Sequence, residues 1–564
     1  MNTILAPLRE LGEYEDIQKQ LNTQQGKVSI SGCVDSQKLH MIYGFTEKYD
    51  VKLIVTYSDM KAKELLDDCK LYCRESYYFP AKDLIFYQAD IHSNQLIKER
   101  VAVLRKLLEG EPITIVTTFS ALMAHQLPLS VWQENVIEIE EGGIAEEAAI
   151  ARQLVKMGYE KNYQVEAPGQ FSVRGGIVDI FDLTRENPVR IELWGDEVES
   201  IRSFDIESQR SIEKLTEVSI YPATELILSK KALEDGLARM EKDCKKSAAF
   251  FREETKPEEA HRLEQAVAEL KEQVTQFQSF VNLESYIGYF YEETQSLVDF
   301  VADRKLCICL DEPARIEEHA NAVELEFRES MSTRAEKGYI LPEQMNVLYG
   351  AREIYARLDK NRLLALSTME YKGFPVKFQN RYAVNARNVS SYNNSFPELV
   401  KDLNHYKKNG YRVLLVSASS TRAKRLATDL MDEGLNAFYS DNSQRELQPG
   451  EIMTFYGNVL KGFEYPMLKF VVISESDIFG KQNRKKKKKK VYEGQKIRDF
   501  SDLKIGDYVV HENHGLGIYK GIEKVEVDKV VKDYIKIEYR DGGNLYILAT
   551  GLDVIQKYAS ADAA

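Results

Sequence analysis

Cysteine is scarce in this sequence, with six residues in 564. None of them forms a C-x-x-C motif, since Cys69 and Cys73 are one helical turn apart and Cys307 and Cys309 alternate along an apolar segment. So few cysteines in a chain of this length exclude a disulfide framework. Structural zinc is disfavoured as well, because it requires a tetrahedral set of ligands at characteristic spacings.

A long apolar segment is also missing. No uncharged apolar run approaches the roughly 18 residues of a membrane-spanning helix. The N-terminal residues M-N-T-I-L-A-P-L-R-E lack the basic start and the apolar core of a signal peptide. These two absences predict a cytoplasmic protein without a membrane partner.

Positive charge is in deficit, with 76 Lys and Arg against 89 Asp and Glu and a formal net charge of -13. This balance argues against nonspecific binding of nucleic acid by the whole surface, although a local basic patch could still bind one. The one concentrated basic run is K-Q-N-R-K-K-K-K-K-K at 481–490. Such a run repels itself and is typical of a linker, while contact with a polyanion is the alternative.

No segment matches the phosphate-binding motif G-x-x-x-x-G-K-[ST]. The nearest approach is V-S-I-S-G-C-V-D-S-Q-K-L at 28–39, which predicts a strand, a glycine turn and the start of a helix. Gly32 and Lys38 occupy two positions of the motif, but Gln37 replaces the second glycine and Leu39 replaces the hydroxyl residue that holds Mg²⁺. The segment is either an ordinary turn or a nucleotide site that has been dismantled.

Strands alternate with helices on both sides of a central region, which favours a parallel sheet with helices on its faces. The expected strands include 51–57, 113–118 and 305–310. The last of them ends in Asp311 and Glu312, where a motor ATPase holds Mg²⁺ and positions water. Together with Gly32 and Lys38, this carboxylate pair suggests the two halves of one degenerate nucleotide site in one α/β lobe.

Two central segments, 171–182 and 189–204, alternate apolar and polar residues and predict antiparallel strands, with a bulge at the Gly175-Gly176 pair. In the second segment Arg190 and Trp194 must point to the face opposite the apolar residues. Arg174 lies in the first segment. A tryptophan beside arginines on a polar face is typical of a protein-binding hot spot. An arginine stacked on the ring within the monomer is the alternative.

The C-terminal region consists of short alternating strands separated by turns, which predicts a small β-barrel of about 55 residues. His511 and His514 have no further ligand nearby and are assigned to turns. The segment I-E-K-V-E-V at 522–527 suits an edge strand that accepts a strand from a partner, although an interior strand would have the same pattern.

Two further regions precede the C-terminal strands. A helical region is expected at 232–280, and the strands and helices between 396 and 480 predict a small α/β domain without a catalytic constellation.

Several of these segments resemble the N-terminal part of bacterial transcription-repair coupling factors. The resemblance rests on Q-F-S-V-R-G-G-I-V-D-I-F-D, R-I-E-L-W-G-D-E-V-E-S-I-R-S-F-D, L-D-E-P-A-R-I and S-E-S-D-I-F-G. The most specific motifs are G-D-Y-V-V-H-E-N-H-G-L-G-I-Y-K-G, D-Y-I-K-I-E-Y and L-D-V-I-Q-K-Y. Together they cover nearly the whole chain in the order of the family.

The resemblance implies an α/β multidomain fold. A degenerate P-loop NTPase-like lobe, similar to that of the excinuclease subunit UvrB, would carry an inserted antiparallel α+β domain, followed by a second small α/β domain. A C-terminal SH3/Tudor-like β-barrel would resemble CarD. The implied boundaries are 1–133 and 223–372 for the lobe, 134–222 for the insertion, 373–480 for the small α/β domain, 481–500 for the lysine-rich linker and 501–558 for the barrel.

The resemblance also implies partners. Arg174, Arg190 and Trp194 fall on positions that contact UvrA, and the implied contacts with the RNA polymerase β subunit are Val525, Glu526 and Val527. The chain would thus be a cytoplasmic bacterial adaptor of transcription-coupled nucleotide excision repair. In the family, ATP, Mg²⁺ and most DNA contacts belong to motor domains for which this chain has no motif. We therefore expect no cofactor, no metal, no catalytic residue and no ATP hydrolysis by this chain alone.

Two alternatives stay open. An active ATPase or a UvrB-like excinuclease subunit would need an intact phosphate loop and an aromatic-rich hairpin, and the segment between Phe79 and Val101 is too short for that hairpin. A stand-alone transcription regulator similar to CarD would use the terminal barrel alone. It would leave the first 480 residues without a role.

Overall fold

The computed structural model describes residues 2–82, 94–276, 283–480, 495–496, 504–511, 515–527, 530–538, 544–548 and 555–559. Contacts divide the chain into two compact units, residues 1–82 with 98–482 and residues 83–97 with 483–564. The lysine-rich run at 481–490 and His514 lie outside the described residues.

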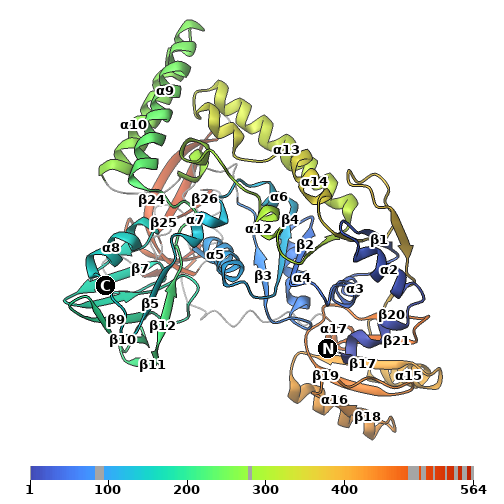
Figure 1. Ribbon diagram of the computed structural model, residues 1–564. Coiled ribbons are helices and arrows are strands. Elements are labelled where there is room, and N and C mark those ends of the chain that lie inside the picture. Colours follow the sequence, from blue (N-terminus) through green and yellow to red (C-terminus); the bar gives the residue numbers. More distant parts are fainter. Residues whose placement is uncertain are drawn as a thin grey trace. The chain divides into compact units, whose positions relative to one another are not determined.

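A seven-stranded sheet forms the centre of the first unit (Figure 1), in the order β15-β1-β14-β13-β2-β4-β3. All neighbouring strands are parallel. The strands are β1 (Lys27–Ser31), β2 (Val51–Thr56), β3 (Ser76–Phe79), β4 (Ile113–Thr118), β13 (Leu306–Asp311), β14 (Leu363–Leu366) and β15 (Asn380–Ala383). Strands β4, β13 and β14 are buried along their whole length, as expected where helices cover both faces of a parallel sheet.

The helices of this lobe come from both sides of the insertion in the sequence. They are α1 (Asn2–Leu5), α2 (Tyr14–Leu21), α3 (Gln37–Phe45), α4 (Asp59–Cys69), α5 (Asn94–Glu109), α6 (Phe119–Met123), α12 (Leu297–Val301), α13 (Pro313–Glu336) and α14 (Ala351–Asp359). The chain leaves the sheet after β4 and returns to it at β13, so the inserted region lies between these two strands in the sequence. Strand β15 still belongs to this sheet, which therefore continues beyond residue 372.

The inserted region contains a six-stranded sheet in the order β11-β10-β9-β8-β7-β6. Its strands are β6 (Glu160–Lys161), β7 (Gln170–Arg174), β8 (Ile177–Ile180), β9 (Val189–Trp194), β10 (Glu197–Phe204) and β11 (Ser211–Leu215). All pairs except β6 with β7 are antiparallel. Helix α8 (Glu147–Lys156) buries Ile150 and Leu154 against the apolar face of the sheet. A second, two-stranded sheet joins β5 (Ile137–Glu140) to β12 (Glu217–Ile220).

The segment expected as one strand at 171–182 is a hairpin. Gly175 and Gly176 have φ angles of 56° and 86° and form the two-residue turn between β7 and β8, rather than a bulge within a strand. Positive φ at both turn residues matches the right-handed twist of the flanking strands, and glycine adopts it without steric cost. The prediction of a bulge was therefore wrong.

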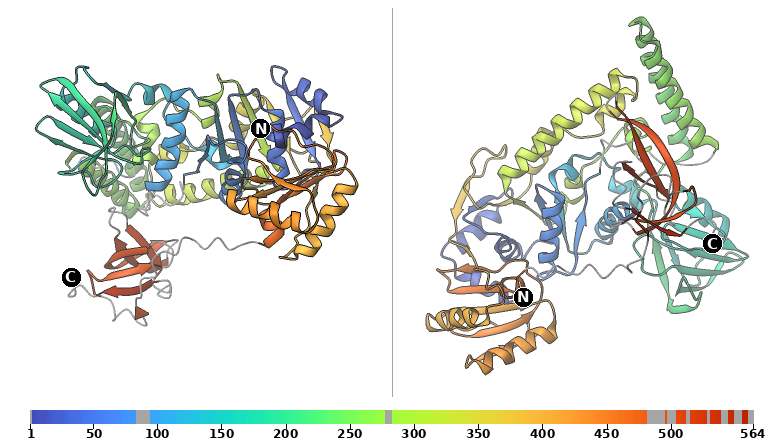
Figure 2. Two further views of the ribbon diagram at one scale, coloured as in Figure 1. Left: turned by 90° about the horizontal axis from the view of Figure 1, so that it is seen from below. Right: turned by 180° about the vertical axis from the view of Figure 1, so that it is seen from behind.

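The helical region after the insertion is also divided. Helices α9 (Lys230–Glu253) and α10 (Pro257–Gln276) are separated at Thr255, which has a φ of 58°. They pack along one another as a hairpin that projects from the lobe (Figure 2). The remaining short helices here are α7 (Leu129–Gln133) and α11 (Ile287–Phe290).

A six-stranded sheet, ordered β16-β20-β21-β17-β19-β18, completes the first unit. Its strands are β16 (Arg387–Asn388), β17 (Arg412–Ser417), β18 (Ala437–Tyr439), β19 (Ile452–Tyr456), β20 (Phe463–Tyr465) and β21 (Phe470–Ser474). Its helices are α15 (Phe396–Lys408), α16 (Ser420–Asp432) and α17 (Glu475–Phe479). One apolar cluster contains residues of this domain and of the lobe, among them Leu39, Val416 and Phe463. The two α/β domains therefore share a core.

The second unit contains a six-stranded antiparallel sheet in the order β22-β27-β23-β24-β25-β26. The strands are β22 (Gln495–Lys496), β23 (Tyr508–His511), β24 (Gly515–Val527), β25 (Val530–Glu538), β26 (Asn544–Leu548) and β27 (Ile555–Ala559). Among the described residues, no helix is long and apolar enough to cross a membrane, and no cluster of three or more His, Cys, Asp or Glu could hold a metal ion.

Candidate functional site

The turn after β1 is where a phosphate would bind in an intact loop. Here its backbone amides donate hydrogen bonds to the segment after β14 and to the start of α3. Gly32 N donates to Thr368 O (3.2 Å), Cys33 N to Ser367 O (3.1 Å) and Val34 N to Gln37 Oε1 (3.1 Å). A Cβ atom at Gly32 would collide with the carbonyl oxygen of Val384, just after β15. The glycine therefore permits the close approach of a neighbouring chain segment, and backbone amides of the turn already have acceptors.

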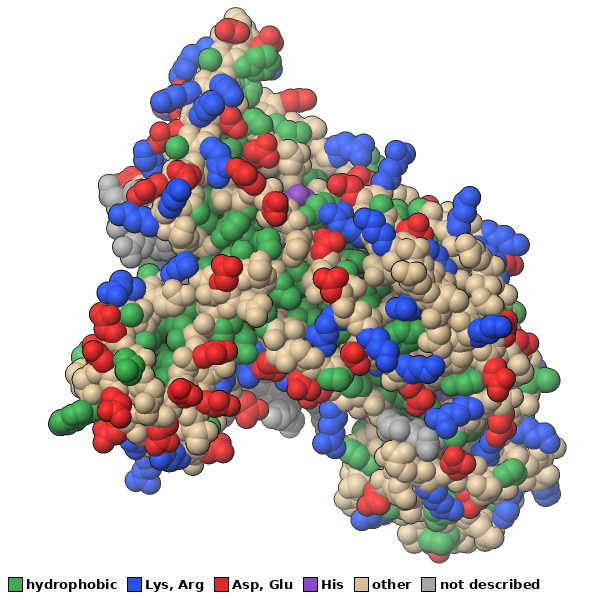
Figure 3. Space-filling view, in the orientation of Figure 1, with side chains coloured by type: hydrophobic (Ala, Val, Ile, Leu, Met, Phe, Trp, Pro, Cys, Tyr) green, Lys and Arg blue, Asp and Glu red, His purple; other side chains and the backbone are tan. Residues whose placement is uncertain are grey.

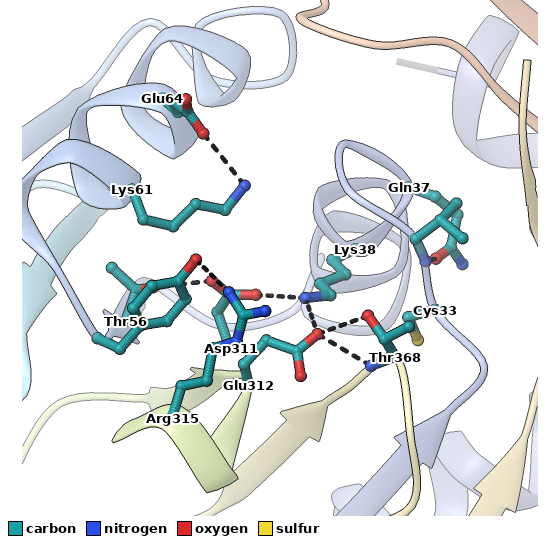
Figure 4. Close-up of polar contacts among 12 residues, drawn as sticks. Cys33, Gln37, Lys38, Thr56, Lys61, Glu64, Asp311, Glu312, Arg315 and Thr368 are labelled. Carbon is teal, nitrogen blue, oxygen red and sulfur yellow. Dashed lines mark hydrogen bonds and ion pairs between the residues drawn. The ribbon is translucent and has the colours of Figure 1, made fainter. Parts of the chain in front are cut away.

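The structure brings together three of the four residues of the suspected degenerate site, namely Lys38, Asp311 and Glu312 (Figure 4). Lys38, in the first turn of α3, places Nζ 2.7 Å from Asp311 Oδ1 and 2.6 Å from Glu312 Oε1. Thr56, at the end of β2, donates its hydroxyl to Asp311 Oδ2 (2.8 Å). Thr368 donates both its amide and its hydroxyl to Glu312 Oε1 (2.9 and 2.7 Å). The carboxyl ends of β2, β13 and β14 thus converge on one lysine.

Electrostatics make this cluster a stable internal ion pair. Burial by itself would lower the pKa of Lys38, but the carboxylates of Asp311 and Glu312 outweigh it and raise that pKa above its usual range. Lys38 and Asp311 are both buried. The lysine that would meet a phosphate is therefore neutralised by carboxylates that would otherwise hold Mg²⁺.

Helix α3 is buried on all sides, because it lies between the seven-stranded sheet and the small α/β domain. Gln37 Nε2 donates to the hydroxyl of Tyr465 (2.7 Å), and His40 Nδ1 lies 2.9 Å from the same hydroxyl. The other ring nitrogen of His40 lies 2.8 Å from Ile4 O in α1. Burial lowers the pKa of His40 to about 4, so the ring is neutral at pH 7. Gln37 and His40 of α3 therefore connect the lobe to the small α/β domain through the hydroxyl of Tyr465.

A buried carboxylate lies at the same domain boundary. Asp68, near the end of α4, accepts a hydrogen bond from the amide of Leu460 (2.7 Å), in the small α/β domain. Burial is the main reason that its pKa is raised to about 7, against the lowering effect of the hydrogen bond from Ser36. Between the ordinary pKa of an aspartate and pH 7, the folded state therefore holds a proton that the unfolded state releases.

Asp68→Asn should stabilise the protein more at pH 8 than at pH 5. The contribution of a group with a raised pKa is present at low pH and is lost as the pH rises through the folded pKa of about 7, whereas asparagine does not titrate. The gap in unfolding free energy between variant and wild type should grow by about 2 kcal/mol between these pH values. Urea unfolding at both pH values measures it, with Asp67→Asn at the more exposed neighbouring carboxylate as control. An equal gap at both pH values would contradict the assignment.

The two predicted arginines of the insertion converge on a carboxylate that the sequence analysis missed. Asp179, on β8, is buried and accepts from Arg190 Nε (2.7 Å) and Arg190 Nη2 (2.9 Å) on β9. Arg174 Nη2 on β7 donates to the same carboxylate (2.8 Å). Three adjacent strands therefore form one Arg-Asp-Arg group, in which one negative charge balances two positive ones.

Trp194 stands apart from this group and is 80% exposed at the end of β9. Buried and accessible side chains alternate along β9, as the sequence pattern predicts. The ring that receives an arginine is that of Phe204, with the guanidinium of Arg190 4.4 Å from its centroid. The alternative expectation, an arginine stacked on Trp194, was therefore wrong for the described residues. The polar face of β9 therefore carries an exposed aromatic side chain on the same strand as Arg190.

The predicted polymerase-binding residues Val525, Glu526 and Val527 lie on β24, where they pair with Lys532, Val531 and Val530 of β25. On the other side of β24, pairing with β23 ends at Ile518. Within the described part of the second unit, residues 520–527 therefore have a strand neighbour on one edge only. An edge strand is one of the two possibilities that the sequence pattern at 522–527 allows, and the described strands agree with it.

Sequence reasoning missed three residues that complete these two clusters, namely Asp179, Thr56 and Thr368. Asp179 occupies a polar position in an alternating strand, directly opposite Arg190, and this alternation was the available signal. The two threonines follow or end buried strands, but threonine is common in strands and gives no separate signal.

Two family models match the chain. One is the UvrB interaction domain, over residues 137–226, and the other is the CarD-like/TRCF RID domain, over residues 503–559. The first contains Arg174, Asp179, Arg190 and Trp194, and the second contains the whole of β24.

Curated relatives match along nearly the whole chain. The transcription-repair-coupling factor of Bacillus subtilis (strain 168) is 34% identical over 568 residues, which cover 100% of this chain and 48% of that protein. The namesake proteins of Staphylococcus epidermidis (strain RP62A) and Staphylococcus aureus (strain MRSA252) are 28% and 27% identical over 95% and 99% of this chain. The chain spans about half the length of these relatives. Along its whole length the chain is similar to the N-terminal portion of transcription-repair-coupling factors.

Proposed function

We propose that this chain is the recruitment part of a coupling factor for transcription-coupled nucleotide excision repair. It binds UvrA through the inserted domain and the β subunit of a stalled RNA polymerase through the second unit. The observation that carries the proposal is the presence of a UvrB interaction domain and a CarD-like/TRCF RID domain in one chain. Two separate interaction modules suit an adaptor, because each can engage its own partner.

The UvrA contact is assigned to the polar face of β7, β8 and β9. Arg174 and Arg190 are held by Asp179, and their positions are fixed before a partner arrives. Fixed side chains lose little entropy on binding, so each contact contributes more to affinity. Trp194 supplies a large exposed aromatic surface of the kind that is enriched in hot spots.

The polymerase contact is assigned to the free edge of β24 at Val525, Glu526 and Val527. An exposed strand edge can accept a strand from a partner, with main-chain hydrogen bonds supplying affinity. Among the strands that the structure describes, residues 520–527 pair on one side only, which supports this mode. We further propose that the second unit is a small SH3/Tudor-like barrel, on the basis of the CarD-like family match.

The lobe is proposed as a scaffold with a degenerate P-loop NTPase-like fold that needs neither ATP nor Mg²⁺. The pairing of Lys38 with Asp311 and Glu312 supports this, because a nucleotide would have to break buried ion pairs in order to bind. The same pairing argues against the alternative of an active ATPase or excinuclease subunit. A CarD-like regulator alone would leave the UvrB interaction domain unused. ATP, Mg²⁺ and most DNA contacts are proposed for the remaining length of the relatives.

A bridging assay tests the proposal directly. RNA polymerase of the source organism is immobilised, and UvrA of the same organism is passed over it with or without this chain. We expect UvrA to be retained only when the chain is present, and Val525→Asp to abolish retention while leaving direct binding of UvrA to the chain intact. Binding of one partner but never both at once would refute the adaptor function.

A further inference from the structure

Residues 142–147 form a segment that runs beside the turn between β9 and β10 and is fixed to it. Gly142 N donates to Val198 O (2.8 Å), Val198 N to Gly143 O (2.9 Å) and Ala145 N to Asp196 O (2.7 Å). At its other end, Glu147 Oε2 accepts from Gly176 N (2.9 Å) in the turn between β7 and β8. The segment is therefore fastened to the turns of both hairpins that carry the proposed UvrA contacts.

The middle of this segment presents an apolar side chain to solvent. Ile144 is 89% exposed, even though hydrogen bonds of its neighbours fix its backbone. It forms an antiparallel bridge with Glu197, which in turn lies opposite Trp194. Residues directly opposite one another in a sheet project from the same face. Ile144, Glu197 and Trp194 therefore form one row in which two exposed apolar side chains flank a carboxylate.

Such a row is unfavourable in water, since an isoleucine side chain is stabilised when it is buried. Apolar side chains that are fixed, exposed and continuous with a polar docking face mark interaction surfaces. The surroundings are acidic, with Glu146, Asp196 and Glu197 all exposed. Acidic side chains gather over this inserted domain on the face seen in Figure 3.

We infer that Ile144 is a second apolar anchor for the partner that binds Arg174, Arg190 and Trp194, so that the docking surface extends onto residues 142–147. The inference rests on the proposed UvrA contact and deepens it. The partner surface that fits is an apolar socket bordered by basic groups, which would face the carboxylates around Ile144. Trp194 and Ile144 enter this socket on either side of Glu197.

The test measures the affinity of the full 564-residue chain for purified UvrA by surface plasmon resonance. Ile144→Ala should weaken binding by about 10-fold, and Ile144→Glu by more, because it places a charge in an apolar socket. Tyr163→Ala is the matched control, since Tyr163 is 86% exposed in the same domain, next to β6 at the other end of the sheet. It should change the affinity less than twofold, and all three variants should keep the wild-type unfolding temperature.

Trp194→Ala, measured in parallel, distinguishes this inference from the proposed function. If Trp194→Ala weakens binding while both Ile144 variants behave as Tyr163→Ala does, the extended surface is wrong and the UvrA contact stands. If wild-type protein does not bind UvrA, both are wrong. Support requires that Ile144→Ala and Trp194→Ala each weaken binding and that their combined effect departs from additivity, as expected for two anchors of one socket.

Discussion

Trp194→Ala should weaken the binding of UvrA at least about 30-fold, equivalent to roughly 2 kcal/mol, without destabilising the protein. The side chain is 80% exposed, so its removal costs the monomer little packing. A partner that covers it would lose a large buried aromatic surface. Titration calorimetry with UvrA measures the first effect, and urea unfolding measures the second, which should stay below about 0.5 kcal/mol.

Arg190→Ala is the informative comparison, because Arg190 also has a structural role. Its guanidinium forms two hydrogen bonds with buried Asp179 and stacks on Phe204. Truncation should abolish UvrA binding and also lower the unfolding free energy by about 2–3 kcal/mol, since Asp179 then retains one charged partner among the described residues, Arg174. Both variants should still bind the polymerase β subunit. Loss of both partners together would indicate misfolding and would remove the support for a specific contact.

The sequence was sufficient to predict the meeting of Lys38 with Asp311 and Glu312. Parallel strands deliver their carboxyl ends to one edge of a sheet, so a lysine after one strand and a carboxylate pair at the end of another are expected to lie close together. The sequence could not predict that they neutralise one another. That outcome depends on the burial of α3, which requires Tyr465 and its neighbours, more than 400 residues away along the chain.

On the inserted domain, period-two alternation correctly placed Arg190 and Trp194 on the polar face of β9. It failed at Gly175 and Gly176, because alternation continues through a two-residue turn and does not show where the chain reverses. The alternation also did not predict that Ile144 is exposed, since an apolar residue between short polar stretches is usually buried. Its exposure follows from the bridge to Glu197, a tertiary contact between segments 53 residues apart.

Lys38→Ala should lower the unfolding free energy of the lobe by about 3–5 kcal/mol, because it leaves Asp311 buried with its partner removed. The matched control is Lys61→Ala, since Lys61 pairs at 3.3 Å with the more exposed Glu64 in the same region (Figure 4). Loss of that pair should cost less than about 1 kcal/mol. Urea unfolding of the two variants measures the difference.

Neutralising the carboxylates should rescue the Lys38 variant, since the penalty comes from buried charge left unpaired. Lys38→Met combined with Asp311→Asn and Glu312→Gln should regain most of the lost stability, because Thr56 and Thr368 can still donate to the amide oxygens.

Millimolar ATP with Mg²⁺ should leave the unfolding midpoint of the wild-type chain unchanged, whereas a ligand of the folded state would raise it. A midpoint that rises with ATP and no longer does so in Lys38→Ala would establish a working nucleotide site and overturn the scaffold assignment.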